Sequence, residues 1–203
     1  MEVDPAEAAF SQLGDRLRGL PRRRSRLELR QAAVLVPLSW RDDELWVTLI
    51  RRPSSMSSHS GQVACPGGRL DPGETSRDAA LRETHEELGL PARQVEVLGP
   101  LHDVEVLVSR HVVTPWVARI PAEPELVPNP DEVERVFSVP LSVLADPVRG
   151  GFELRELTHA GKSYQVPYWT YANEVIWGAT GRMLLDLLRV LERDPTRPGT
   201  GWS

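Results

Sequence analysis

The sequence has a single cysteine, Cys65, so no disulfide can form within the chain, which fits a reducing compartment. It has no apolar run of transmembrane length, and its first residues, MEVDPAEAAF, lack the apolar core of a signal peptide. Basic residues are fewer than acidic ones, 24 against 29, and the net charge of −5 argues against binding to a nucleic-acid backbone. We therefore expect a cytoplasmic protein with neither a membrane nor a nucleic acid as its partner.

The bulk composition is that of a globular protein, with 203 residues, 40% apolar and 26% charged. The hydrophobic pattern predicts three parts, which are an N-terminal helix with a basic linker (1–28), a main domain (29–193) and a flexible tail (194–203). Strand and helix patterns in the main domain interleave without a regular βαβ rhythm. This predicts an α/β fold with a mixed β-sheet and helices on both sides.

The finer pattern predicts a helix over 5–20 and strands at 32–38, 45–51, 62–65, 95–101, 104–108, 112–120 and 136–140, with a hairpin of 152–157 and 163–171. Pro115 suggests that its strand is an edge strand or contains a bulge. Asn173 is expected to cap a long helix that runs to about Leu191.

The stretch that organises the chain is GGRLDPGETSRDAALRETHEELGL, residues 67–90. Thr75 is an expected helix N-cap, and Asp78 completes a variant of the capping box. Gly89 is a natural stop. These signals predict a helix over 76–88 that follows a turn rich in glycine and proline.

Three glutamates of this helix, Glu83, Glu86 and Glu87, are spaced at i, i+3 and i+4, which places their carboxylates on one face. Like charges repel at this spacing. One interpretation is an acidic face exposed to solvent. The other is a site for Mg²⁺ or Mn²⁺, because these ions prefer carboxylate oxygens and leave coordination positions for water and phosphate.

The stretch resembles the Nudix box, G-x5-E-x7-R-E-U-x-E-E-x-G-U, in which U is an apolar residue. The matching positions are Gly68, Glu74, Arg82, Glu83, Glu86, Glu87, Gly89 and Leu90. Thr84 stands where an apolar residue is usual, and we expect a small packing cost there. The resemblance implies the Nudix α/β/α sandwich with a mixed sheet, in which the box forms a loop-helix-loop.

Nudix hydrolases typically cleave a nucleoside diphosphate linked to another moiety, with metal ions that activate a water. The resemblance implies that Glu83, Glu86 and Glu87 bind the metal, with the Gly68 carbonyl as a further ligand. It also implies that Arg82 orients these carboxylates.

The resemblance also implies that Glu74 is the partner of Arg82 in this orienting role. An ordinary helix ion pair of Arg82 with Asp78 or Glu86 fits the spacing as well. Both contacts can exist together, so the sequence leaves the choice open.

The general base of the reaction is less defined by the sequence. Glu132 and Glu134, in the loop before a strand, are candidates, although surface carboxylates fit the pattern too. Cys65 has no reactive context and is interpreted as a small core residue. Trp169 and Trp177 are the aromatic residues that we consider for substrate stacking.

The segment before the box resembles the upstream signature of coenzyme A pyrophosphatases in this family, of the form LLTxR-S-x3-R-x3-G-x3-F-P-G-G. The aligned stretch is TLIRRPSSMSSHSGQVACPGG, Thr48 to Gly68. The later segments NPDEVERVFSVPL and VIWGATGRMLLDLL are also similar to that subfamily. The matching residues are Arg52, Gly61, Pro66, Gly67 and Gly68, and the departures are Pro53 for Ser, Ser57 for Arg and Cys65 for Phe.

This resemblance implies hydrolysis of coenzyme A to 3′,5′-ADP and 4′-phosphopantetheine. Another nucleoside diphosphate derivative, such as ADP-ribose, and a non-catalytic ligand-binding module are the alternatives. The predicted substrate-binding residues are Arg51, Arg52, Gly61 and Gly67, with the Ser-rich loop 52–60 as a wall of the cleft. The basic run before residue 30 is either a solvated linker or an anion contact at the site mouth. We keep a homodimer as a candidate assembly.

Overall fold

The structure is a computed structural model that describes residues 4–54, 61–146, 148, 153–159 and 162–192. Its main sheet has eight strands in the order β3-β2-β1-β7-β5, with β4 paired to β1, β6 to β7 and β8 to β2. A second sheet has the order β11-β10-β9. The elements are α1 (Pro5–Arg18), β1 (Arg30–Arg41), β2 (Glu44–Arg51), β3 (Val63–Ala64), β4 (Gly67–Arg69), α2 (Ser76–Leu88), η1 (Ala92–Gln94), β5 (Glu96–Pro100), β6 (Val104–Val106), β7 (His111–Arg119), β8 (Arg135–Pro140), α3 (Leu141–Ala145), β9 (Glu153–His159), β10 (Lys162–Tyr171), β11 (Glu174–Trp177) and α4 (Gly178–Glu192).

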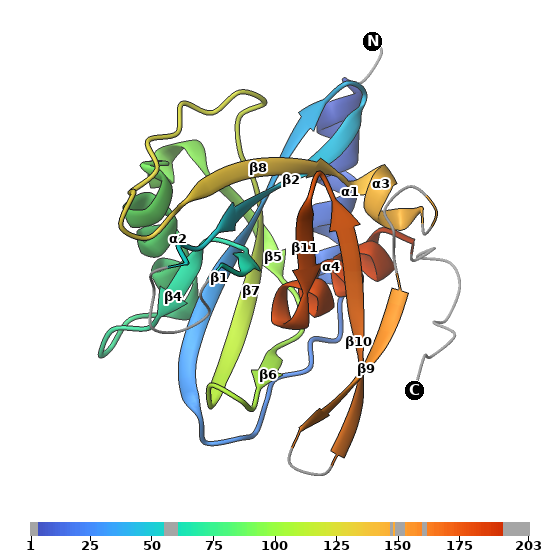
Figure 1. Cartoon of the computed structure of the whole chain (residues 1–203). Coiled ribbons are helices and arrows are strands. Elements are labelled where there is room, and N and C mark those ends of the chain that lie inside the picture. The colour runs from blue at the N-terminus through green and yellow to red at the C-terminus, as the bar shows by residue number, and fades with distance from the viewer. Residues whose placement is uncertain (1–3, 55–60, 147, 149–152, 160–161, 193–203) are drawn as a thin grey trace.

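Helices cover both faces of the main sheet (Figure 1). Successive residues of a strand point to opposite faces, and β1 follows this rule. Ala33 and Leu35 pack in one core with the alanines of α2. Val36 and Leu38 pack in the other core, to which α1 and α4 contribute. The predicted α/β/α sandwich with a mixed sheet is therefore confirmed.

The strands β1 and β2 pair only near their connecting turn, from Leu38 opposite Val47 to Arg41 opposite Glu44. Farther along, β1 pairs with β4 and β2 pairs with β3. The segment 63–69 therefore lies between the two diverging strands. Its ladder hydrogen bonds fix the chain immediately before α2, which is where the glycines of the motif lie.

The N-terminal helix α1 ends at Arg18, two residues before the predicted end. Its Phe10, Leu13 and Leu17 are buried in the same core as β1 and α4. The N-terminal segment thus shares the core of the main domain, while the division at residue 28 stays a prediction. The predicted tail, 194–203, lies outside the described residues.

The helix that Asn173 was expected to cap begins later, so that prediction is wrong. Residues Glu174–Trp177 form β11, and Gly178 begins α4. The reason is a tight hairpin, since Ala172 and Asn173 have φ angles of 50° and 65° and Tyr171 pairs with Glu174. Two consecutive residues at positive φ turn the chain back as a strand.

Pro115 lies in an interior strand, because β7 pairs with β1 on one side and with β5 and β6 on the other. The edge-strand alternative is therefore wrong, and the register shift between β5 and β7 lies at Val97 to Gly99, opposite Ala118 and Val117 rather than at Pro115. The proline is tolerated because β5 pairs with β7 up to Trp116 and β6 only from Val113. The missing N–H of Pro115 falls between these two partners, and its carbonyl still accepts a hydrogen bond from the Leu101 N–H.

Candidate active site

The helix α2 begins and ends where its local signals predict. The Thr75 side chain accepts a hydrogen bond from the Asp78 N–H at 3.2 Å, and its hydroxyl donates to the Asp78 carboxylate at 2.7 Å. Gly89 has a φ of 67°, and its N–H donates to the His85 carbonyl. These caps set the helical register, and the register sets where each glutamate points.

Glu87 is fully buried, which differs from the exposed acidic face that the spacing suggests. Its Oε2 accepts a hydrogen bond from the Gly67 N–H at 2.8 Å. Arg52 Nη2 lies 3.0 Å from its Oε1 as an ion pair, but without hydrogen-bond geometry, so this buried oxygen has no hydrogen-bond donor. Burial raises the pKa of Glu87 to about 7, although Arg52 and the Gly67 N–H oppose the rise; Glu83 and Glu132 add to it.

Arg82 joins several carboxylates of the motif. Its Nε and Nη2 donate to the two oxygens of Glu74, at 2.9 and 3.0 Å. Its Nη1 donates to Glu83 and to Glu86, at 3.0 Å each. Arg82 Nη2 also donates to the Arg69 carbonyl at 3.0 Å. Hydrogen bonding from Arg82 lowers the pKa of Glu74, and the planar guanidinium holds three carboxylates in one arrangement.

The two glycines before the helix are required by close approach. A Cβ on Gly68 would lie 2.4 Å from Cδ of Glu83, and a Cβ on Gly67 would lie 2.3 Å from the Ala33 carbonyl oxygen. Gly67 also has a φ of 150°, which favours glycine. The Glu83 carboxylate therefore packs directly on the backbone of β4. Burial raises the pKa of Glu83; Arg82 opposes this rise.

Glu132 approaches the same carboxylates from a distant loop. The N–H groups of Val127 and Asn129 donate to the carbonyls of Leu88 and Glu87, which ties this loop to the end of α2. Asn129 Nδ2 then donates to Glu132 Oε1 at 3.2 Å. The charge of Glu132 contributes to the raised pKa of both Glu83 and Glu87. Sequence reasoning named Glu132 but missed Asn129, which the Asn-Pro turn signal could have indicated.

The carboxylates are held by arginines in this arrangement, and among the described residues no group of three or more His, Cys, Asp or Glu side chains is set to hold a metal ion. Two observations still fit a hard divalent cation. The buried Glu87 Oε1 has no hydrogen-bond donor, and the cluster offers only oxygen ligands. A divalent ion would also offset the raised pKa values of Glu83 and Glu87.

Comparisons with known proteins agree with this geometry. The model of the NUDIX domain matches residues 29–160. The chain belongs to the Nudix family. Nudix hydrolase 3 of Caenorhabditis elegans is 35% identical over 178 residues, which cover 80% of this chain and 73% of that protein. An uncharacterized Nudix hydrolase, NudL, of Photorhabdus laumondii is 34% identical over 164 residues, which cover 80% of this chain and 86% of the relative.

Among solved structures, a MutT/nudix family protein from Enterococcus faecalis shares the fold, with a TM-score of 0.53 and 19% identity over 95% of this chain and 76% of its own. The family match and the two relatives identify this Nudix chain as an enzyme, a pyrophosphohydrolase. Nudix hydrolases act on small nucleotide substrates and generally use divalent metal ions.

Two residues that depart from Nudix patterns have structural explanations. Thr84 is fully buried, and its hydroxyl donates to the Ala80 carbonyl at 2.7 Å, so the polar atom is satisfied within the helix. Cys65 is buried in the core, and burial raises the pKa of its thiol to about 12. A thiol that stays protonated is a poor nucleophile, which agrees with its interpretation as a core residue.

The predicted substrate residues do not gather at one place. Arg52 contacts Glu87 and the Gly67 carbonyl, while Arg51 contacts Glu174 instead. Gly61 has a φ of 66° and open space around it. Ser57 and the rest of 55–60 lie outside the described residues, so the proposed loop wall stays a prediction. The basic linker lies beside β6, since the Arg23 carbonyl accepts from the Asp103 N–H, and β1 and β7 separate it from β4.

Trp169 is fully buried, and its Nε1 donates to the Leu144 carbonyl at 3.0 Å. This tryptophan is a core residue, and a stacking role for it is excluded. Trp177 is partly exposed in β11 and stays a candidate.

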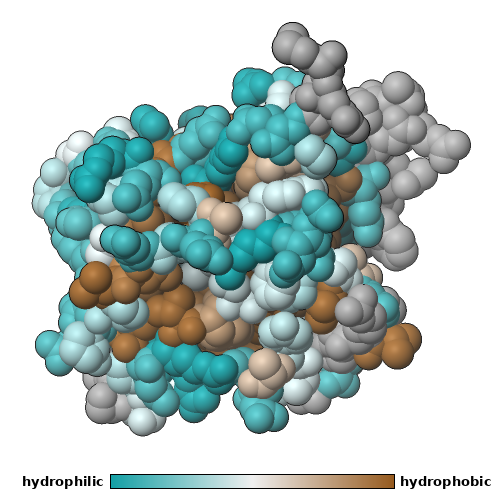
Figure 2. Space-filling model, turned by 90° about the horizontal axis from the view of Figure 1, so that it is seen from above, coloured by the Kyte–Doolittle hydropathy of each residue, from teal (hydrophilic) through white to brown (hydrophobic). Residues whose placement is uncertain are grey.

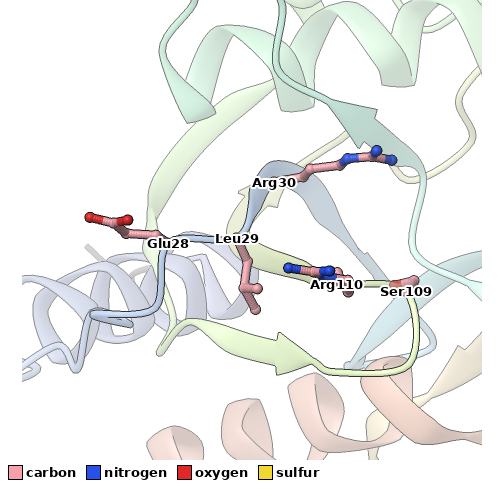
Figure 3. Close-up of a pocket in the computed structure, with 5 residues that line it drawn as sticks. All are labelled: Glu28, Leu29, Arg30, Ser109 and Arg110. Atoms are coloured by element: carbon pink, nitrogen blue, oxygen red, sulfur yellow. The ribbon is translucent and has the colours of Figure 1, made fainter.

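Two surface hollows lie away from the carboxylates of the box. A cavity of ≈ 360 Å³ is lined by residues 28–30, where the linker enters β1, and by Ser109 and Arg110 before β7, and Figure 3 shows them. A second hollow is lined by residues 93–96 and 119–121. Seen from above, apolar residues gather in separate patches between hydrophilic ones (Figure 2). Within the described residues no helix is long and apolar enough to cross a membrane.

A conservative change at Arg82 tests its orienting role. Lysine keeps the charge of Arg82 but loses the planar fork that reaches Glu74 and Glu83 at once. We expect Arg82→Lys to lower kcat roughly ten- to a hundredfold, the range for residues that orient metal ligands. Steady-state kinetics at saturating metal measure this. Arg77→Lys, on the exposed side of the same helix, is the control, and equal activity of the two variants would reduce Arg82 to a surface ion-pair partner.

The raised pKa of Glu87 predicts a pH-dependent stability without metal. The folded state holds the Glu87 proton more tightly than the unfolded chain does. This contribution is complete below the ordinary carboxyl pKa and is lost as the pH rises through about 7. In chelator, the Tm of the native protein should therefore fall relative to that of Glu87→Gln between pH 5 and pH 8. A constant difference in Tm between the two proteins would contradict the burial argument.

Proposed function

We propose that this enzyme hydrolyses coenzyme A within its pyrophosphate, giving 3′,5′-ADP and 4′-phosphopantetheine, with Mg²⁺ or Mn²⁺. The observation that carries this proposal is the position of the stretch that resembles the coenzyme A signature. Arg52 of that stretch donates to the Gly67 carbonyl at 2.9 Å and pairs with Glu87. Arg52 and Gly67, in the two described parts of this stretch, thereby lie against Glu87 of the box.

Glu83, Glu86 and Glu87, with the Gly68 carbonyl, are the proposed metal ligands. A bound divalent ion supplies charge for the diphosphate oxygens and lowers the pKa of a water. The protein's own residues set the geometry around this ion, and Arg82 and Glu74 hold the carboxylates in place.

Glu132 is the proposed general base. It faces Glu83 and Glu87 without being part of α2, and Asn129 fixes its carboxylate at 3.2 Å. A base outside the metal-binding helix can accept a proton from the attacking water while the box carboxylates stay ionised.

Arg52 receives a role beyond substrate contact in this proposal. Its guanidinium neutralises the buried Glu87 and braces the Gly67 carbonyl. With 18% of its side chain exposed, it has little surface left for a phosphate. The cations for the outer phosphate of coenzyme A must therefore come from elsewhere.

The substrate is tested by kcat/KM for coenzyme A, dephospho-coenzyme A and ADP-ribose, measured with Mg²⁺ and with Mn²⁺ and with the products identified. We expect coenzyme A to be preferred about tenfold or more, because a charge-assisted contact to its 3′-phosphate is worth ~1.5–3 kcal/mol. A tenfold preference for ADP-ribose would overturn the coenzyme A proposal. Turnover of any of the three with a divalent ion excludes the non-catalytic module.

Three properties from the sequence stay predictions beside this proposal, namely the cytoplasmic location, the absence of a nucleic-acid partner and a homodimeric assembly. The preferred metal is decided by the same assay.

A further inference from the structure

A second buried acid lies outside the box. In the described part of the chain, Glu87 and Glu174 are the acidic side chains that are buried, with Glu174 at 3% exposure. A buried carboxylate is costly unless it is paired and hydrogen-bonded. Glu174 meets this condition through two arginines of the main sheet, although it belongs to the other sheet.

The turn before β11 places Glu174. Ala172 and Asn173 both have positive φ in the two-residue turn between Tyr171 and Glu174. Alanine is disfavoured in this conformation, since its Cβ crowds the backbone there. Strained turns persist where the surrounding structure determines them. This turn brings the Glu174 carboxylate to Arg51 of β2 and Arg135 of β8.

The two arginines lie directly opposite each other in the sheet, Arg51 on β2 and Arg135 on β8. Like charges at such a position repel, and Glu174 lies between them. Arg135 Nη1 donates to one Glu174 oxygen at 2.9 Å, and Arg51 Nη1 donates to the other at 3.4 Å. Arg135 also lies over the Phe137 ring, at 5.7 Å from its centroid.

Both guanidiniums have N–H groups that Glu174 does not use. Half of the Arg135 side chain is exposed, and about a third of Arg51. The buried Nε of Arg51 has no hydrogen-bond partner, since Glu134 Oε1 is 3.7 Å away, too far for a hydrogen bond. The exposed N–H groups of the two guanidiniums are where a ligand oxygen can bind, and the buried Nε of Arg51 becomes available to it when Glu134 moves aside.

We propose that Arg51 and Arg135, oriented by Glu174, bind a phosphate monoester of the substrate that lies outside the hydrolysed diphosphate. This rests on the proposed function, in which the outer group is the 3′-phosphate of coenzyme A. The backbone connects the pair to the box, since Arg51 precedes Arg52 in the chain and the Arg51 carbonyl accepts from the Glu134 N–H, two residues beyond Glu132. Two guanidiniums held in fixed positions match the several oxygens of a phosphate.

Glu134 has an opposing role in this arrangement. It is exposed, and its Oε1 lies 3.7 Å from the Arg51 Nε, in the position that a phosphate oxygen would take. Its charge, with that of Glu174, balances the two arginines. A phosphate therefore competes with Glu134 for Arg51 while Glu174 remains in place, and removal of the Glu134 charge should strengthen phosphate binding.

The experiment compares 3′,5′-ADP with 5′-AMP, which differ only in the 3′-phosphate, by calorimetric titration in the presence of chelator. The native protein should bind 3′,5′-ADP roughly ten- to a hundredfold more tightly. Arg135→Ala should bring this ratio close to one. Glu134→Gln should raise the affinity for 3′,5′-ADP about two- to fivefold and leave 5′-AMP unchanged.

Arg93→Ala, which removes an exposed arginine outside this cluster, is the control and should keep the native ratio. Circular dichroism confirms that each variant is folded, and Arg135→Lys, which keeps the charge but loses the fork, replaces the alanine variant if that one is unfolded. An unchanged ratio in the Arg135 variant, or weaker 3′,5′-ADP binding by Glu134→Gln, would overturn the subsite.

The outcome for the subsite can be separated from that for the substrate. If coenzyme A is not hydrolysed but Arg135→Ala still abolishes the discrimination, the proposed function fails and the phosphate subsite stands. If coenzyme A is hydrolysed and the variant discriminates like the native protein, the subsite fails and the proposed function stands.

Discussion

Replacing Glu87 by glutamine should reduce kcat by roughly a thousandfold, since metal-ion stabilisation of charge is worth several kcal/mol and each ~1.4 kcal/mol is a factor of ten. Glutamine can still accept the hydrogen bond from the Gly67 N–H, so the loop should keep its place. The fold should persist, because the change removes a carboxylate whose ionised form is disfavoured by burial. Kinetics over a range of Mg²⁺ and Mn²⁺ concentrations measure the loss.

Direct titration with Mn²⁺ separates metal binding from turnover in the same variant. Glu86→Gln should also lower kcat by orders of magnitude, because Glu86 is a proposed metal ligand. Arg82 holds its carboxylate beside that of Glu83. Glu123→Gln removes an exposed carboxylate near the start of the loop between β7 and β8 and should behave like the native enzyme. Full activity in both Glu86→Gln and Glu87→Gln would refute their assignment as metal ligands.

The second large effect is expected at Glu132. Glu132→Gln should lower kcat by about two to three orders of magnitude, the contribution of a well-placed general base, with little change in KM. The amide can still pair with Asn129, so the loop and the end of α2 should keep their contacts. Affinity for Mn²⁺ should be unchanged, which distinguishes a base from a metal ligand.

Glu134→Gln is the matched control, two residues away on the same loop. Glu134 faces Arg51 rather than the box carboxylates, so this variant should retain kcat, and any change should be confined to the affinity for the 3′-phosphate. Equal losses in the two variants would indicate a general electrostatic effect of the loop, and loss of activity in Glu134→Gln alone would move the general base to Glu134.

The sequence by itself determined the helix of the box and its ends. Each cap joins residues close in the chain, Thr75 with Asp78 and Gly89 with His85, and these hydrogen bonds form as the local pattern predicts. The link between Arg82 and Glu74 was predictable from the resemblance to the box, and both residues lie on one short segment. Strand positions followed from apolar patterns because burial on the two faces of a sheet repeats every second residue.

The tertiary structure decided which of these residues are buried. Helical spacing places Glu87 beside Glu83, but only the packing of α2 on the sheet removes Glu87 from solvent. Arg52 reaches it because the segment 63–69 fills the gap between β1 and β2. Those pairings join residues far apart in the chain, and local patterns carry no signal for them.

The same distinction explains the errors at Asn173 and Pro115 and the cluster around Glu174. A two-residue turn with positive φ at an alanine has no strong sequence signal, so the sequence predicts a helix where β11 lies. The proline is tolerated in β7 only because two different strands meet beside it. Arg51 and Arg135 come to oppose each other through the register of β2 and β8. Local hydrogen bonds and periodicity depend on residues that are close in the chain. Strand register and the burial of charge depend on which distant segments pack together.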